Sequence, residues 1–114
     1  MSGSAAAEDE YRLVLTTCPD RAVALRIANA LVEARAAACV NVLPGITSVY
    51  RWEGGVLEDS EVLLVIKTLA GAVPAVEKQV GMLHPYELPE IIAVPLDTGA
   101  KDYLAWISDS VTAV

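Results

Sequence analysis

Apolar and polar positions along this chain alternate in two ways, one with the period of a strand and one with the period of a helix. Four segments rich in β-branched and aliphatic residues predict strands, at residues 11–17, 38–43 with an extended continuation over 46–52, 61–68, and 90–96. Turn-forming residues interrupt them at Pro44-Gly45 and at residues 53–55. The second and third strands are therefore predicted to form a long antiparallel hairpin that bends near Pro44.

Two segments between the strands carry apolar residues at steps of three and four, which predicts amphipathic helices. The first follows Pro19, with Asp20 as its N-cap candidate and an apolar stripe at Val23, Ile27, Leu31 and Ala34. The second has Pro74 in its first turn and must end before Pro85, because a residue that precedes proline is pushed out of the helical region. Residues 101–111 predict a closing helix.

The predicted order is β-α-β-β-α-β followed by a terminal helix. This order is typical of the ferredoxin-like α+β fold, in which two helices cover one face of an antiparallel sheet. At 114 residues, the chain is expected to form one domain. Residues 1–10 are small and acidic and predict a disordered tail, so the folded domain is expected to span residues 11–114.

Composition adds constraints on assembly and on partners. The chain is 54% hydrophobic, and this surplus of apolar surface favours burial against a second copy. The net charge of −7 argues against nucleic acid and against anionic membranes as partners. No apolar run approaches the roughly 18 residues that a membrane-spanning helix needs. The two cysteines form no C-x-x-C motif and the N-terminus does not resemble a signal peptide, so a cytoplasmic protein with free thiols is predicted.

The stretch "LHPYELPEI", residues 83–91, contains the single histidine of the chain, His84. Neutral imidazole is a common ligand of copper and zinc, and it also serves as a general base. The alternative is a histidine that ends the second helix and hydrogen-bonds a nearby backbone carbonyl. No nucleophile stands beside a base in the sequence, so no catalysis is expected, and no motif indicates an organic cofactor.

Four sequence motifs, taken together and in order, resemble the CutA family of divalent-ion tolerance proteins. They are "AACVNVLPGITSVYRWEG", "EVLLVIKT", "HPYELPEI" and "DYLAWI". The resemblance runs from about Arg12 to Ile107. It implies a homotrimer built by strand pairing between subunits, with an architecture like that of the PII signalling proteins. It also implies a role in tolerance of divalent metal ions, and Cu²⁺ is the ion that some members bind.

The resemblance suggests metal ligands, with two departures from the relatives that bind copper. His84 and Cys18 are the candidate ligands. Those relatives can carry a cysteine inside the first strand, whereas Cys18 comes only at its end. Some also have a second histidine before the H-P-Y motif, where this chain has Leu83. Cys39 lies in an apolar run and is expected to be a buried small hydrophobe.

Tyr50 and Trp52, near the tip of the predicted hairpin, are the candidates for the trimer interface; the alternative is that they pack on their own domain. A cleft between subunits is expected to be lined by Trp52, Lys67, Tyr86 and Glu90. Two functions follow from this resemblance. One is a copper-binding signalling or buffering protein without catalysis. The other is a PII-like sensor that binds a small anionic metabolite or nucleotide in the cleft.

Overall fold

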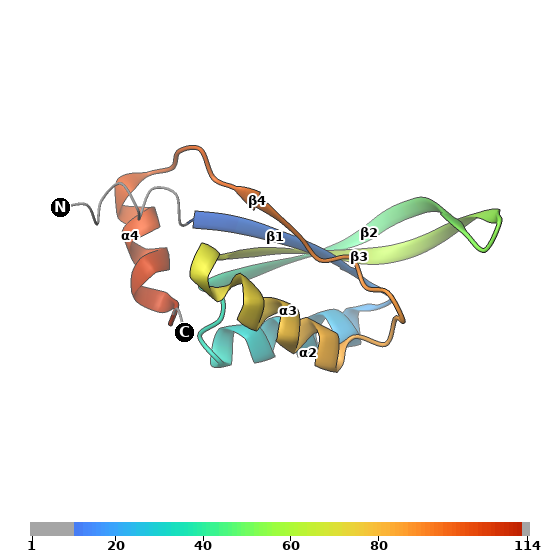
Figure 1. Cartoon of the computed structure of the whole chain (residues 1–114), viewed down its shortest axis with the longest axis horizontal. Helices are drawn as coiled ribbons and strands as arrows, with labels where there is room; N and C mark the ends of the chain where they lie inside the picture. Colours follow the sequence, from blue (N-terminus) through green and yellow to red (C-terminus); the bar gives the residue numbers. More distant parts are fainter. Residues whose placement is uncertain (1–10, 113–114) are drawn as a thin grey trace.

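The computed structural model describes residues 11–112, so the predicted tail at residues 1–10 lies outside the described part of the chain. The elements follow one another as β1 (Tyr11–Cys18), α2 (Arg21–Glu33), β2 (Cys39–Trp52), β3 (Gly55–Leu69), the 3₁₀ turn η1 (Ala70–Ala72), α3 (Val73–Leu83), β4 (Ile92–Pro95) and α4 (Lys101–Ser110). The sheet order is β2-β3-β1-β4, and every neighbouring pair is antiparallel. The predicted ferredoxin-like α+β fold with an added C-terminal helix is confirmed (Figure 1).

The two helices of the α layer begin and end where the sequence signals lie. Asp20 is the N-cap of α2, and its Oδ1 accepts a hydrogen bond of 2.9 Å from the backbone N–H of Val23. Pro74 occupies the first turn of α3, where its missing N–H costs nothing. The helix ends at His84, whose N–H still donates to the carbonyl of Val80 at 2.8 Å.

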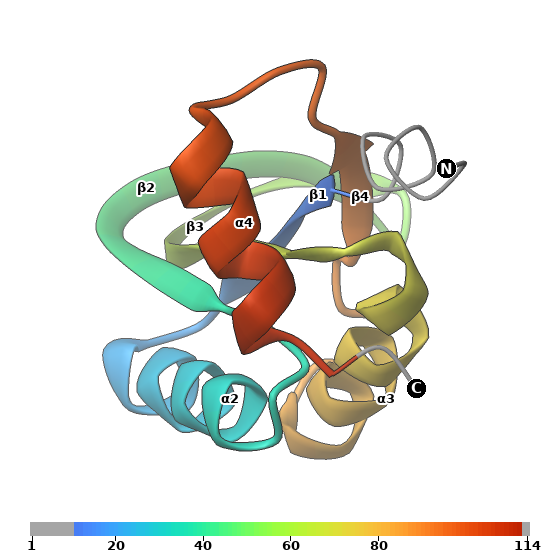
Figure 2. The same cartoon turned by 90° about the vertical axis from the view of Figure 1, so that its left-hand side faces the viewer.

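One face of the sheet packs against α2 and α3, which lie together beneath it in Figure 1 and Figure 2. Because side chains alternate between the faces of a strand, the even-numbered residues of β1 and β3 point into this core. The buried residues of the layer include Val14, Cys18, Ile27, Leu31, Val62, Leu64, Ile66, Val76 and Val80. This core holds the sheet and the helices in a fixed arrangement.

The odd-numbered residues of β1 and β3 point to the opposite face, which α2 and α3 leave free. At one end of that face, α4 crosses the sheet and packs Ile107 beside Tyr11 and Leu69 (Figure 2). Further along, apolar side chains of β2 and β4, among them Leu43, Ile92 and Val94, remain exposed. We call this surface the helix-free face.

The β2–β3 hairpin extends well beyond the helices (Figure 1) and makes the molecule elongated, with a longest dimension of 52 Å. Glu53 and Gly54, both with positive φ, form its two-residue turn between Trp52 and Gly55. The predicted bend near Pro44 is a β-bulge between Leu43 and Ile46, where Gly45 has φ of +81°. The third strand begins at Gly55 rather than at Glu61 as predicted. Ladder bonds to β2 keep its polar first half extended.

The fourth strand is shorter than predicted, since it covers only Ile92–Pro95. The residues before it form an irregular connection from α3, which runs past the end of β1 toward the hairpin (Figure 1). No helix within residues 11–112 is long and apolar enough to cross a membrane.

Candidate functional site

An open groove of about 690 Å³ lies between the hairpin and the connection from α3 to β4. Its lining residues are Thr17 of β1, residues 48–52 of β2, Asp59 and Glu61 of β3, and residues 86–90 of the connection. Segments that are far apart in the sequence therefore meet here. The groove combines three aromatic side chains, Tyr50, Trp52 and Tyr86, with four carboxylates, Asp59, Glu61, Glu87 and Glu90.

The register of the hairpin explains why so many functional side chains share one face. Ser48 lies opposite Asp59, and Ile46 lies opposite Glu61. The bulge at Pro44-Gly45 places two residues of β2 against one of β3. Before the bulge, odd-numbered residues of both strands share a face; after it, even-numbered residues of β2 share a face with odd-numbered residues of β3. As a result, Tyr50 and Trp52 lie on the same face as Asp59 and Glu61, and that face continues the helix-free face.

His84 anchors the connection to the sheet. Its Nε2 lies 2.7 Å from the carbonyl oxygen of Thr17, and its Nδ1 accepts the backbone N–H of Tyr86 at 3.2 Å. The neutral tautomer with a proton on Nε2 satisfies both contacts. His84 is only 8% exposed, and its ring also contacts the ring of Tyr86 at a centroid distance of 4.6 Å. His84 therefore fixes where Tyr86 enters the groove.

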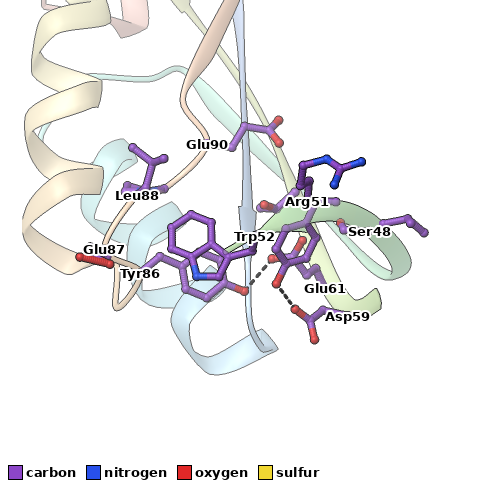
Figure 3. A pocket seen from close by; sticks show the side chains of 13 residues that line it. Ser48, Arg51, Trp52, Asp59, Glu61, Tyr86, Glu87, Leu88 and Glu90 are labelled. Atoms are coloured by element: carbon purple, nitrogen blue, oxygen red, sulfur yellow. Dashed lines mark hydrogen bonds between the residues drawn. The ribbon is translucent and has the colours of Figure 1, made fainter. Parts of the chain in front are cut away.

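Two tyrosines donate hydrogen bonds to the carboxylates of β3 (Figure 3). The hydroxyl of Tyr86 donates to Glu61 Oε2 at 2.6 Å, and the hydroxyl of Tyr50 donates to Asp59 Oδ2. Burial, together with the hydrogen bond to Glu61, raises the pKa of Tyr86 far above that of free tyrosine. The hydrogen bond to Asp59 is the main cause of a raised pKa at Tyr50. Both phenols are therefore protonated donors at neutral pH.

The charge of the groove is dominated by its acids. Arg51 is the one basic residue of the lining. By strand alternation its side chain belongs to the face opposite Trp52, and Figure 3 shows its guanidinium pointing away from Trp52 and Tyr86. Negative charge with aromatic side chains attracts cations and repels anions.

The structure brings together three of the four residues predicted to line a cleft. Trp52, Tyr86 and Glu90 all line the groove. Lys67 does not line this groove of one chain, and its assignment to a cleft between subunits stays a prediction. It lies six residues along β3 from Glu61, roughly 20 Å away at strand spacing, and its Nζ is 3.9 Å from Cys39 Sγ.

Asp59 and Glu61 were missed by sequence reasoning. A short polar run, "EDSE", is their only local signal. Their relation to Tyr50 and Tyr86 depends on the strand register and on the path of the connection, and the sequence pattern did not specify either.

The candidate metal ligands are not presented to solvent within one chain. Both ring nitrogens of His84 are engaged by backbone groups, which matches the alternative interpretation of a histidine that bonds a carbonyl. Cys18 is fully buried, and burial raises its thiol pKa to about 11, so it is protonated at neutral pH. Among residues 11–112, no three His, Cys, Asp or Glu side chains form a group suited to a metal ion. Cys39, expected to be buried, is only half-buried.

Tyr50 and Trp52 contribute to the groove of their own chain, yet each remains 38% exposed. Their packing matches the alternative that the sequence left open, namely contact with their own domain. Their exposed fractions leave room for a contact with a second copy as well, so the interface assignment stays a prediction.

Comparison with known proteins places this geometry in a family. The model of the CutA1 divalent ion tolerance protein family matches residues 12–110. The divalent-cation tolerance protein CutA of Thermus thermophilus is 51% identical over 98 residues, which are 86% of this chain and 95% of that protein. The human protein CutA is 46% identical over an alignment of 120 positions, which covers 99% of this chain and 67% of that protein.

Solved structures agree with the sequence comparison. A Thermus thermophilus divalent cation tolerance protein superposes with a TM-score of 0.88 at 49% identity, covering 90% of this chain and 99% of that one. CutA1 from Oryza sativa gives a TM-score of 0.90 at 38% identity, covering 95% of this chain and 99% of that one. This chain therefore belongs to the CutA1 family of divalent ion tolerance proteins.

Proposed function

We propose that this protein contributes to tolerance of divalent metal ions as a homotrimeric, non-catalytic binding protein in the cytoplasm. Membership of the divalent ion tolerance family is the observation that carries the proposal. Two free thiols, one of them buried, suit a reducing compartment, although relatives include one named chloroplastic and one described as periplasmic. The lone histidine has both nitrogens engaged and the buried thiol is protonated, which supports a role without nucleophilic catalysis.

The exposed apolar side chains of the helix-free face support assembly. Ile92 and Val94 of the edge strand β4 are 52% and 44% exposed on that face. Apolar side chains on an edge strand are normally covered by another chain. We expect the trimer to bury them, with Tyr50 and Trp52 of the hairpin at the boundary between subunits.

Light scattering tests the assembly. We expect a mass of three times 12.1 kDa for the wild-type protein and a smaller mass for Val94→Lys. Met82→Lys is the matched control, because Met82 is 63% exposed on α3, on the helix side of the molecule. A wild-type monomer, or an equal effect of the two lysine substitutions, would contradict the proposed interface.

We expect a bound metal ion to take ligands from more than one subunit, because residues 11–112 of one chain contain no three-ligand group. Copper is the ion that we propose. Calorimetric titration of Cu²⁺ into the wild-type trimer, in buffer without reductant, is expected to show saturable binding at micromolar concentration. The absence of binding to a folded trimer would refute copper binding.

His84 is tested as a ligand in the same experiment. His84→Gln keeps a donor toward the Thr17 carbonyl and removes the imidazole, so it is a gentler change than His84→Ala. Loss of Cu²⁺ binding in a folded His84→Gln trimer would make His84 a ligand. Unchanged binding would assign the copper to other donors.

The groove itself favours a second candidate, a PII-like sensor of a small molecule. Its volume of about 690 Å³ is that of a small-molecule site. The expected ligand from the resemblance was a small anion or a nucleotide, but the acidic lining works against this charge. Thermal-shift measurements with ATP and inorganic phosphate test the anionic class, since a ligand of the native state raises the melting temperature.

A further inference from the structure

Glu61 is a largely buried residue whose carboxylate has one hydrogen-bond donor among residues 11–112. Its side chain lies in the groove, but the residue is only 7% exposed. Tyr86 donates to Oε2, whereas Oε1 has no donor among residues 11–112 and is not fully shielded from solvent. No Lys or Arg of this part of the chain forms an ion pair with Glu61. A carboxylate that faces a groove without a cationic partner beside it favours the entry of a cation.

The surroundings of Glu61 suit a cation with an organic body. In one chain, the residues Trp52 and Tyr86 are 38% and 36% exposed, which leaves side-chain surface open to contact. Figure 3 shows Trp52, Tyr86 and the carboxylates of Asp59 and Glu61 gathered at one end of the groove. Ring faces attract ammonium groups within about 6 Å, and most strongly so for tryptophan.

A bare metal ion does not explain this groove. The described residues contain no three-ligand metal group, and a volume of about 690 Å³ far exceeds what an ion fills. Leu88 and Pro89 supply apolar surface from the connection. Figure 3 shows Leu88 at the side of the groove away from Asp59 and Glu61. Pockets for small molecules combine such apolar surface with a few placed charges.

We propose that the groove binds an organic ammonium ion, with its charged nitrogen between Glu61, Asp59 and the ring of Trp52, and with its alkyl body along Leu88 and Pro89. This site goes beyond the proposed role in metal tolerance and does not depend on copper binding. The cationic head replaces the missing partner of Glu61, while Tyr86 and Tyr50 hold the two carboxylates in place.

The test follows the fluorescence of Trp52 in a Trp106→Phe background, which leaves Trp52 as the single tryptophan. Tetramethylammonium and 1,4-diaminobutane are titrated at constant ionic strength, and MgCl₂ serves as the inorganic control. Saturable change with at least one organic cation, and not with Mg²⁺, is the expected result. Binding of one probe alone distinguishes quaternary from primary ammonium ligands.

Paired variants separate a specific site from general attraction. Glu61→Gln is expected to weaken binding by about tenfold or more, which corresponds to about 1.4 kcal/mol. Glu58→Gln removes the same charge from the same strand on the opposite face and is expected to bind as the wild type does. Trp52→Leu, measured by thermal shift, checks the aromatic contact independently should Glu61→Gln fold poorly.

Three results would overturn the proposal. One is that a folded protein shows no saturable response to either organic cation. Another is equal binding of Mg²⁺, or equal weakening by the Glu61 and Glu58 variants, because both indicate unspecific screening. The third is tighter binding of ATP than of either ammonium probe. None of these results bears on Cu²⁺ binding, so the two proposals fail separately.

Discussion

Replacing His84 by alanine removes the two contacts that tie the connection after α3 to the sheet. The Thr17 carbonyl loses its donor and the Tyr86 N–H loses its acceptor. A typical hydrogen bond contributes about 1 kcal/mol net, and a buried polar group left without a partner costs about 1–3 kcal/mol. Because the ring is buried, water does not easily replace either contact. We expect His84→Ala to lower the free energy of unfolding by about 2–4 kcal/mol.

Two further substitutions divide this cost between the contacts. The side-chain amide of glutamine reaches the position of Nε2 and can donate to Thr17. The side-chain oxygen of asparagine lies near the position of Nδ1 and can accept from Tyr86. Each of these variants is expected to lose roughly half as much unfolding free energy as His84→Ala does, because each keeps one contact of about 1 kcal/mol.

Urea denaturation at pH 7.5 measures all three variants against the wild type. The protein concentration must be equal throughout, since the stability of an oligomer depends on it. A loss below about 0.5 kcal/mol for His84→Ala would refute the anchoring role, because it lies within the usual range of surface substitutions. Equal losses for alanine, glutamine and asparagine would show that ring packing, rather than hydrogen bonding, holds the connection.

Three other outcomes follow from the described contacts. Burial and the hydrogen bond to Glu61 raise the pKa of Tyr86, so the phenol proton is lost at lower pH in the unfolded chain than in the folded one. The melting temperature of the wild type should therefore exceed that of Tyr86→Phe by less as pH rises above about 10. A constant difference up to about pH 11 would contradict this. Thr68→Val should cost about 1–2 kcal/mol in urea denaturation, because Thr68 Oγ1 donates to the buried Ala36 carbonyl at 2.6 Å, and a neutral effect would contradict this. Cys18 is buried and its thiol pKa is about 11, so in native protein at pH 8 it should resist alkylation by iodoacetamide. In unfolded protein the same thiol should react fully. Rapid modification of the native protein, detected by mass spectrometry, would show that the thiol is accessible.

Local sequence signals specified most of the fold. The Asp20 cap, Pro74 in a first turn and the Pro85 stop bound two helices correctly, because capping and proline chemistry act over only a few residues. Apolar periodicity separated strands from helices and led to the correct α+β topology. The ends of the third and fourth strands were less accurate, since ladder bonds to a neighbouring strand decide how far a polar segment stays extended.

The groove was only partly predictable, because its residues meet through long-range pairing. The motifs shared with the family suggested Trp52, Tyr86 and Glu90 as site residues, and the fold does bring them together. The absence of Lys67 from the groove of one chain could not be foreseen, because an apolar strand with one lysine carries no information about which end of the sheet that lysine occupies.

The sequence alone determined the set of helices and strands, their order, and the family of the chain, because these depend on local chemistry and on short sequence motifs. Tertiary structure decided which side chains face one another. The bulge after Leu43 shifts the phase of β2 so that Tyr50 meets Asp59, and the two contacts of His84 lead Tyr86 onto Glu61. A shift of one residue in β2 would send Tyr50 to the other face of the sheet, because side chains of a strand alternate with a period of two. That geometric sensitivity is why an acidic aromatic groove appears only in the folded chain.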